Sequence, residues 1–258
     1  MSGEPDLEQL RAAAHEVREL SGRGTLAEFL AADELPARVP PAVVRELADV
    51  WLRHQDELSA QAADALYLLV RHPREPALGP RFAAALAFAA QAHAEQVRKG
   101  SGLPYLGHLL GVCALVIGDG GGEDEAIAAL LHDAVEDQGG EEMLERIRER
   151  FGADVARIVL GCSDTLQTPK PPWRERKEAY LAHLQDADGS ILRVSLADKL
   201  DNARSIARDL GVYGETVWRR FGAPREEQLW YYRALSALFL VRTPGPLADE
   251  LAVAVAAL

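Results

Sequence analysis

The segment AALLHDAVEDQ, residues 128–138, has the spacing of an amphipathic helix, and we expect a helix over residues 125–137. One face of this helix is apolar and consists of Ile127, Leu130, Leu131, Ala134 and Val135. The opposite face is polar and consists of His132, Asp133, Glu136 and Asp137. A plain solvated surface is the simplest interpretation of such a polar face.

Two physical costs count against a plain solvated surface. Gly139 and Gly140 mark the predicted C-terminal end, so the three carboxylates lie where the helix dipole is negative and favours cations. Like charges one turn apart also destabilise a helix by about 0.2–0.5 kcal/mol per pair. A positive group from outside the helix offsets both costs, and a histidine beside an aspartate indicates a divalent metal ion.

Helical periodicity extends along the chain without convincing runs of alternating β-branched residues, so the predicted fold class is all-α. The predicted helices span residues 5–20, 41–57, 59–71, 81–97, 105–117, 125–137, 141–150, 153–161, 173–185, 190–208 and 225–241. We expect residues 1–78 to form an N-terminal helical extension of unknown role and residues 79–258 to form the main multi-helix domain.

Composition and charge restrict the partners and the compartment. The 258 residues carry a formal net charge of −12, which argues against duplex DNA or an anionic membrane as a partner because both would repel the protein. The apolar runs FAAALAFAA and LAVAVAAL are shorter than the roughly 20 residues that a spanning helix needs. Only two cysteines occur, which fits a reducing compartment. We therefore expect a soluble, cytoplasmic protein, whose oligomeric state the sequence does not indicate.

Further donors for a metal ion have to come from other segments. In LADKLDN, Asp198 and Asn202 lie one turn apart on the face opposite the buried leucines, although a solvated face is the favoured interpretation of that motif in isolation. Two histidines compete for the remaining position. His93 lies on an apolar stripe, where a hydrogen-bonded core role is favoured, and His108 lies near the start of a helix. Spacing alone leaves both open.

Four segments in register carry a family resemblance: QVRKGSGLPYLGHLLGV, AALLHDAVED, FGADVARIV and LADKLDNAR. Together they resemble the HD-domain metal-dependent phosphohydrolases, in particular the hydrolase domain of RelA/SpoT-type stringent-response enzymes and the stand-alone small alarmone hydrolases. The resemblance covers about residues 80–240 and implies an all-helical HD-type fold. One departure is His108-Leu109, where the family usually has His-Pro.

The resemblance also implies roles for individual residues. It implies a manganese-type ion, Mn²⁺, held by His108, His132, Asp133 and Asp198. It implies that the catalytic pair Glu136 and Asp137 positions and activates the attacking water. It implies substrate binding by Arg98, Lys99, Lys170, Asn202 and Tyr231. A hard ion with His and Asp ligands and open positions suits Mn²⁺, whereas structural Zn²⁺ usually takes four ligands in a closed site.

Three functions are compatible with these residues. The leading hypothesis is a phosphohydrolase that removes the 3′-pyrophosphate from guanosine tetra- or pentaphosphate, so the expected partner is a phosphorylated nucleotide. The second is a nucleotide phosphatase that releases orthophosphate, including one that acts on a cofactor such as NADPH. The third is a catalytically silent nucleotide-binding sensor, which ranks lower because Glu136 and Asp137 are both present.

Overall fold

The computed structural model describes residues 78–165, 167 and 169–258. The chain divides into two units, residues 1–77 and Leu78–Leu258, and the described fold is that of the second unit. The predicted N-terminal helical extension, with the helices expected at 5–20, 41–57 and 59–71, lies outside the described residues.

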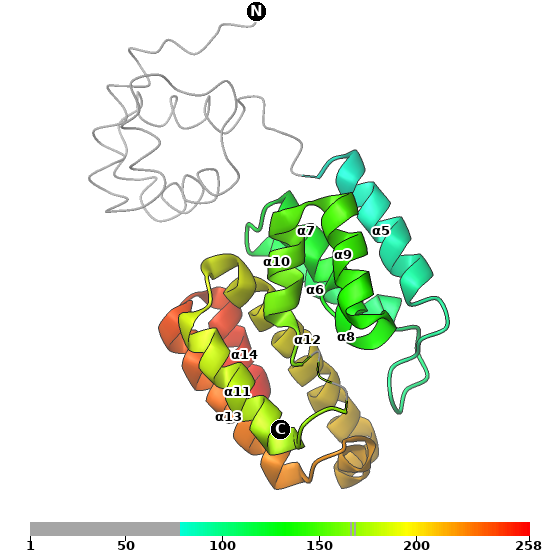
Figure 1. Cartoon of the computed structure of the whole chain (residues 1–258). Helices are drawn as coiled ribbons and strands as arrows, with labels where there is room; N and C mark the ends of the chain where they lie inside the picture. Colours follow the sequence, from blue (N-terminus) through cyan, green and yellow to red (C-terminus); the bar gives the residue numbers. More distant parts are fainter. Residues whose placement is uncertain (1–77, 166, 168) are drawn as a thin grey trace, which may run out of the picture. The chain divides into compact units, whose positions relative to one another are not determined.

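The second unit is built of helices, and the described residues contain no β-strand (Figure 1). An isolated β-bridge joins Val97 and Pro104. The all-α prediction is therefore confirmed. In chain order, the helices are α5 (Pro80–Ala92), α6 (Leu106–Gly118), α7 (Glu123–Leu131), α8 (Ala134–Gln138), α9 (Gly140–Phe151), α10 (Ala153–Cys162), α11 (Trp173–Asp186), α12 (Gly189–Tyr213), the 3₁₀-helix η1 (Gly214–Arg220), α13 (Arg225–Arg242) and α14 (Pro246–Ala256).

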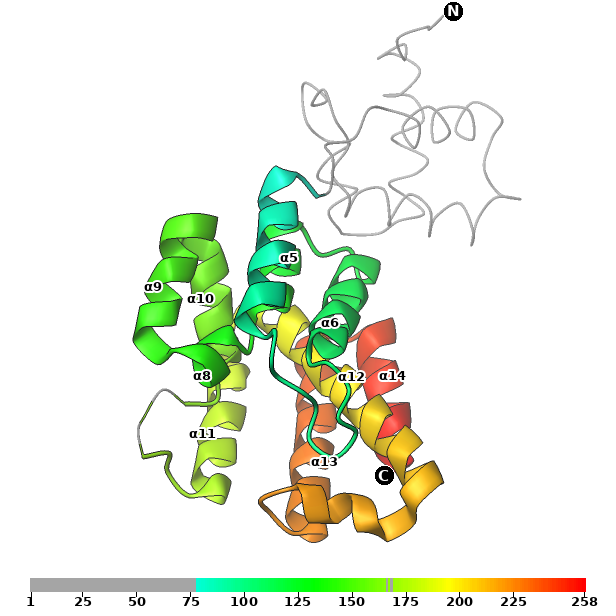
Figure 2. The same ribbon diagram turned by 90° about the vertical axis from the view of Figure 1, so that its right-hand side faces the viewer.

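The longest of these helices, α12, passes through the middle of the bundle (Figures 1 and 2). It contacts α6, α7 and α10 as well as α13 and α14. The helix begins at an N-cap, Asp188, whose carboxylate accepts the backbone N–H groups of Ser190 at 3.0 Å and Ile191 at 3.2 Å. Because α12 packs against so many helices, its polar side chains come next to residues of α6 and α7.

The prediction of one helix over residues 125–137 was wrong, because the chain leaves the helix between α7 and α8. His132 Nδ1 lies 2.8 Å from the carbonyl oxygen of Ala129. In a regular helix that oxygen accepts the backbone N–H of residue 133, so the imidazole takes the place of a helical hydrogen bond. The break also carries His132 into the interior, where it is buried, and separates it from the outer polar face expected from the helical wheel.

Other helix boundaries also differ from the prediction. The helix expected at 81–97 ends at Ala92, and the chain then turns back so that the Tyr105 N–H donates to the Gln96 carbonyl at 2.9 Å. The helix expected at 190–208 continues to Tyr213. Helix α14 was not predicted, although a proline occupies its first turn. None of the described helices combines the length and the apolar character that crossing a membrane requires.

Candidate active site

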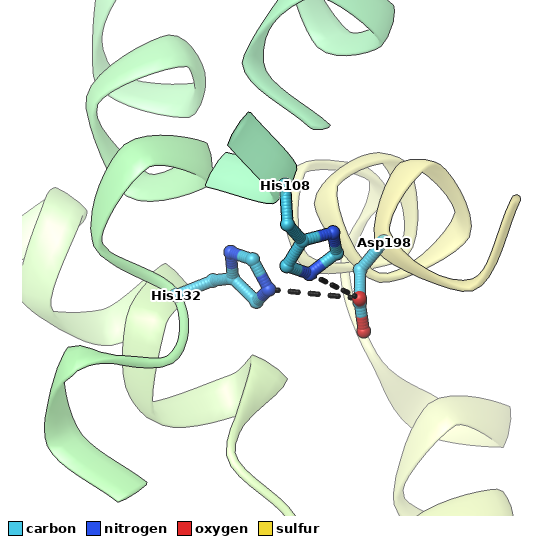
Figure 3. A group of neighbouring side chains, drawn as sticks. All are labelled: His108, His132 and Asp198. Atoms are coloured by element: carbon cyan, nitrogen blue, oxygen red, sulfur yellow. Dashed lines mark ion pairs between the residues drawn. The ribbon is translucent and has the colours of Figure 1, made fainter. Parts of the chain in front are cut away.

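Three buried side chains from separate segments meet at one point of the described fold. His108 lies in the first turn of α6, His132 directly follows α7, and Asp198 lies on α12. Figure 3 shows both imidazoles directed at the same carboxylate, with Asp198 Oδ1 lying 3.2 Å from His108 Nε2 and 3.6 Å from His132 Nε2. This arrangement of donor atoms can hold a metal ion.

The other ring nitrogen of each histidine is already engaged. His108 Nδ1 lies 2.7 Å from Asp201 Oδ2, and His132 Nδ1 bonds the Ala129 carbonyl. A carbonyl oxygen only accepts, so His132 Nδ1 carries the hydrogen, and Nε2 of the neutral ring has its lone pair free. Both Nε2 atoms are buried without a hydrogen-bond partner. Two such nitrogens beside a carboxylate fit a divalent cation, which takes both kinds of ligand.

Asp133, the fourth predicted ligand, lies at the same point. Its Oδ2 atom is 3.0 Å from His132 Nε2 and 3.6 Å from His108 Nε2. The same oxygen accepts a hydrogen bond of 2.5 Å from the Tyr105 hydroxyl. Burial and the neighbouring Asp133 raise the pKa of Tyr105 well above its usual range, so this hydroxyl remains a donor. All four residues predicted to hold the metal are therefore neighbours.

The pKa shifts of His108, His132 and Asp198 show that this buried cluster favours positive charge. Burial lowers the pKa of His108, but Asp133, Asp198 and Asp201 outweigh burial and raise it to about 10. Although burial lowers the pKa of His132, carboxylates also raise it well above its usual value. Burial raises the pKa of Asp198, but Lys199 and the two histidines hold it well below its usual range. A divalent cation supplies the positive charge that protons otherwise supply here.

A cavity of about 370 Å³ adjoins the cluster. Its acidic lining residues are Asp133, Glu136, Asp137 and Asp209. Its basic lining residues are Arg98, Lys99, Lys177, Lys199 and Arg220. Five cationic side chains around one cavity favour a ligand with several negative charges, since each phosphate can accept charge-assisted hydrogen bonds from them.

Three of the five predicted substrate-binding residues line this cavity: Arg98, Lys99 and Asn202. The guanidinium of Arg98 donates to Asp201 Oδ2 at 3.0 Å and to Asn202 Oδ1 at 2.6 Å. Asn202 Nδ2 in turn donates to Asp198 Oδ1 at 2.5 Å. Arg98 is therefore fixed against the same helix that supplies the candidate metal ligand Asp198.

The catalytic pair predicted from the resemblance, Glu136 and Asp137, also lines the cavity. Glu136 accepts a hydrogen bond from Lys170 Nζ at 2.7 Å and one from the backbone N–H of Asp164 at 3.3 Å. Lys170 is about half exposed and does not line the cavity itself. The segment PKPP, residues 169–172, which carries Lys170, thus reaches the site through this ion pair.

Tyr231, like Lys170, is a predicted substrate-binding residue that does not line the cavity. It is buried, and its ring packs edge-on against Trp173 with centroids 5.9 Å apart. Lys177, which lines the cavity, contacts Tyr231, with Nζ 5.0 Å from the ring centroid. Its neighbour Tyr232 lines the cavity, as does Tyr105.

Several residues of the site had no assigned role from the sequence, among them Tyr105, Lys177, Lys199 and Asp201. Asp201 shares a polar helix face with Asp198, and Tyr105 lies three residues before His108, so both had a local signal. Lys177 had none, because only the packing of α11 brings it to the cavity. His93, the competing histidine, is buried outside the cluster and stacks on Tyr105 with centroids 5.5 Å apart.

Comparison with known proteins finds several relatives of this chain. The Xenopus tropicalis protein named guanosine-3′,5′-bis(diphosphate) 3′-pyrophosphohydrolase MESH1 is 40% identical over 124 residues, which are 47% of this chain and 66% of the relative. The chain thus spans just under two thirds of the frog protein. The Drosophila melanogaster protein of the same name is 33% identical over 141 residues, which are 54% of this chain and 74% of the relative.

A solved structure shows the same architecture. It is described as a metazoan ortholog of SpoT that hydrolyzes ppGpp, and it matches with a TM-score of 0.57 at 27% identity, over 70% of this chain and 96% of that chain. The family model of the HD domain matches residues 85–226, which is more than half of the chain. On the strength of this match and of the helical architecture, the chain belongs to the HD domain family.

Proposed function

We propose that this protein is a metal-dependent phosphohydrolase that removes the 3′-pyrophosphate from guanosine tetra- or pentaphosphate. One observation carries the proposal: two buried imidazole nitrogens without a hydrogen-bond partner face Asp198 next to a cavity that five cationic side chains line. The names of the frog and fly relatives support the choice of substrate.

Membership of the HD domain family implies a divalent metal ion, and His108, His132 and Asp198 form a cluster that can hold one. We assign Asp133 as the fourth ligand, because its Oδ2 atom lies within 3.6 Å of both Nε2 atoms. The ion we propose is Mn²⁺, since two nitrogens and two carboxylates with open positions for water and phosphate suit it better than a closed structural zinc site. Such an ion, when bound, acidifies a coordinated water and neutralises charge on phosphoryl oxygens.

Glu136 and Asp137 are the residues of this chain that we assign to the water. Hydrolysis forms a bond between the water oxygen and the phosphorus attached to the ribose 3′-oxygen, breaks the bond from that phosphorus to the 3′-oxygen, and leaves a proton on the new 3′-hydroxyl. A carboxylate at the cavity wall can take the proton from water, and such acid–base help contributes typically 10²–10⁴ in rate. Glu136 lines the cavity and is held in place by Lys170.

The cationic lining residues bind the rest of the substrate in this proposal. Arg98 offers a planar fork, which suits both a phosphate group and stacking on a base. Lys99 adds a point charge for a phosphate at the cavity wall, and Asn202 adds an amide for the ribose or a phosphate. Lys170, which lies outside the cavity lining and pairs with Glu136, adds a second point charge. Tyr231 acts through packing in this arrangement, because Lys177 lies against its ring and itself lines the cavity.

The experiment that tests the function is product identification by mass. The full chain is loaded with Mn²⁺ and incubated with guanosine tetraphosphate, guanosine pentaphosphate and NADPH. We expect pyrophosphate together with GDP or GTP from the two guanosine substrates. Release of orthophosphate from any of them would favour the phosphatase, and recovery of all three ligands unchanged at high enzyme concentration would favour a sensor.

A further inference from the structure

One side chain, that of Gln96, donates a hydrogen bond to Asp137, and the proposed chemistry gives Gln96 no role. Asp137 Oδ2 accepts this hydrogen bond of 2.7 Å from Gln96 Nε2, and both residues line the cavity. Within the part of the chain that the structure describes, no group donates to the other carboxylate oxygen, Oδ1. Gln96 thus occupies one oxygen of Asp137 and leaves the second one free.

The backbone of Gln96 is fixed on both sides. Its N–H donates to the His93 carbonyl at 3.1 Å, and its own carbonyl accepts the Tyr105 N–H at 2.9 Å. Gln96 lies in the loop between α5 and α6, where the bridge from Val97 to Pro104 closes the next turn of chain. Because the backbone of Gln96 is fixed, its side chain can move only by changing rotamer.

Two donors also fix the side-chain amide of Gln96. Its Oε1 atom accepts from His93 Nδ1 at 2.6 Å and from Gln138 Nε2 at 2.5 Å. The opposite amide orientation would place the Gln96 NH₂ group against the Gln138 NH₂ group and the Gln96 oxygen against the Asp137 carboxylate. Only one orientation satisfies every partner, and it directs Nε2 to Asp137.

We propose that Gln96 is a positioning residue for turnover: its amide holds Asp137 in the one rotamer that presents Oδ1 to the attacking water. This inference rests on the proposed hydrolase function. The physical need is clear from the neighbours of Asp137. Asp133 and Glu136 lie on the same short stretch, so an unheld carboxylate would turn away from them. A misplacement of about 1 Å can cost 10² in rate.

The substitution Gln96→Glu tests the role selectively. A glutamate keeps the oxygen that accepts from His93 and Gln138, replaces the donor to Asp137 and adds one negative charge. A second variant, Gln96→Met, removes the donor without adding a charge. The matched control is Gln91→Glu, which places the same charge change on the exposed surface of α5. For each protein, kcat and KM for guanosine tetraphosphate are measured together with bound manganese.

We expect kcat to fall at least tenfold in Gln96→Glu and in Gln96→Met, with KM and manganese content within twofold of the unaltered protein. Gln91→Glu should keep kcat within twofold. An unchanged kcat in either Gln96 variant overturns the positioning role, and so does a loss of kcat that follows an equal loss of manganese. Absence of pyrophosphate release by the unaltered protein has a different meaning, because it refutes the proposed function and this inference with it.

The double variant Gln96→Glu/Asp137→Asn separates packing from chemistry. An asparagine amide at 137 can donate to a glutamate at 96, so the hydrogen bond is restored with its direction reversed. We expect thermal stability to return to that of the unaltered protein while kcat stays at least tenfold low, because no carboxylate then faces the water from position 137. Recovery of kcat in the double variant would overturn the role given to this pair.

Discussion

Asp201 Oδ2 lies 2.7 Å from His108 Nδ1, the ring nitrogen opposite to the one that faces Asp198. The same Asp201 oxygen also accepts from Arg98 at 3.0 Å. Burial raises the pKa of Asp201, but His108 and Arg98 outweigh burial and lower it, so this carboxylate stays charged. It thereby orients the imidazole and favours the tautomer whose Nε2 lone pair is free for a metal.

The first prediction concerns this contact. Asp201→Ala should weaken Mn²⁺ binding about 10–100-fold, because a ligating histidine loses the partner that orients it. Asp201→Asn is the matched control, since its amide oxygen still accepts from His108 Nδ1, and its loss should be smaller. Manganese affinity is measured by titration against a competing chelator. An Asp201→Ala protein with the affinity of the unaltered chain would show that the contact does not support the metal.

A second prediction separates the ligands from the proton acceptor. Glu136→Ala should lower kcat by about 10²–10⁴ and leave manganese content unchanged, because Glu136 lines the cavity outside the His-His-Asp cluster. Asp198→Ala should lose the bound manganese, because it removes the oxygen that both imidazoles face. Metal analysis and product release are measured on the same samples. Retention of manganese by Asp198→Ala, or full turnover by Glu136→Ala, would contradict these assignments.

The helical pattern of the sequence was sufficient to predict the class of the fold but not its most important break. Apolar spacing gives the buried stripe of each helix, as at Leu192, Leu196 and Leu200. The break at His132 depends on a bond between its own imidazole and the Ala129 carbonyl, and no periodicity records such a bond. Helix α14 was missed for a different reason: its run LAVAVAAL has no polar residues, so it shows no alternation of apolar and polar faces that would mark an amphipathic helix.

Within the site, the sequence could identify residues that share a helix but not those that meet across helices. Spacing showed that Asp198 and Asn202 share one helix face, but their roles came from the family resemblance; in the structure the two side chains are hydrogen-bonded beside the cavity. The choice between His93 and His108 needed the family resemblance, because spacing along the chain does not show which imidazole meets His132 and Asp198 in space. The partner of His108, Asp201, depends on how α6 packs against α12, which is a property of the folded chain.

A third prediction concerns pH in the metal-free protein. The folded-state pKa of His108 is about 10, and that of His132 is also raised, against about 6.5 in an unfolded chain. A raised folded-state pKa means that protonation stabilises the fold, so this contribution is complete below about pH 6.5 and is lost as pH rises toward 10.

Urea unfolding with a chelator present should therefore give a smaller free energy of unfolding at pH 9 than at pH 6. Mn²⁺ should restore stability at pH 9, because the ion replaces the protons. The control variant His108→Gln should show a weaker dependence on pH, since it removes one of the two titrating rings. Equal stability at both pH values in the metal-free protein would contradict the raised pKa values.

A fourth prediction concerns the loop that carries Arg98 and Lys99. Gly100 has φ of +89°, and a Cβ there would collide with the side chain of Arg220. Gly102 has φ of +67° but no atom within 4 Å of an added Cβ. Both alanine variants carry backbone strain of about 1 kcal/mol, and Gly100→Ala adds a steric conflict at the cavity wall.

Gly100→Ala should raise KM for guanosine tetraphosphate at least fivefold more than Gly102→Ala does, while manganese content stays the same in both. The reason is that the collision displaces either Arg220 or the loop itself, and both contribute lining residues to the cavity. Steady-state kinetics on the two variants measure the difference. Equal KM values would mean that the loop and Arg220 adjust without disturbing the bound nucleotide.

The last prediction uses two glycines of α6 whose surroundings differ. An added Cβ at Gly111 would lie 2.6 Å from Asp201 Oδ1, whereas an added Cβ at Gly107 meets nothing within 4 Å. Alanine is favoured over glycine in a helix by up to about 1 kcal/mol, so Gly107→Ala should leave stability unchanged or raise it slightly.

Gly111→Ala gains the same propensity but pushes Asp201 away from His108. We expect Gly111→Ala to weaken Mn²⁺ binding in the same direction as Asp201→Ala, and Gly107→Ala to bind manganese normally. Chelator titration of the two variants decides the matter, and matching affinities would mean that α6 and α12 separate without loosening the contact between His108 and Asp201.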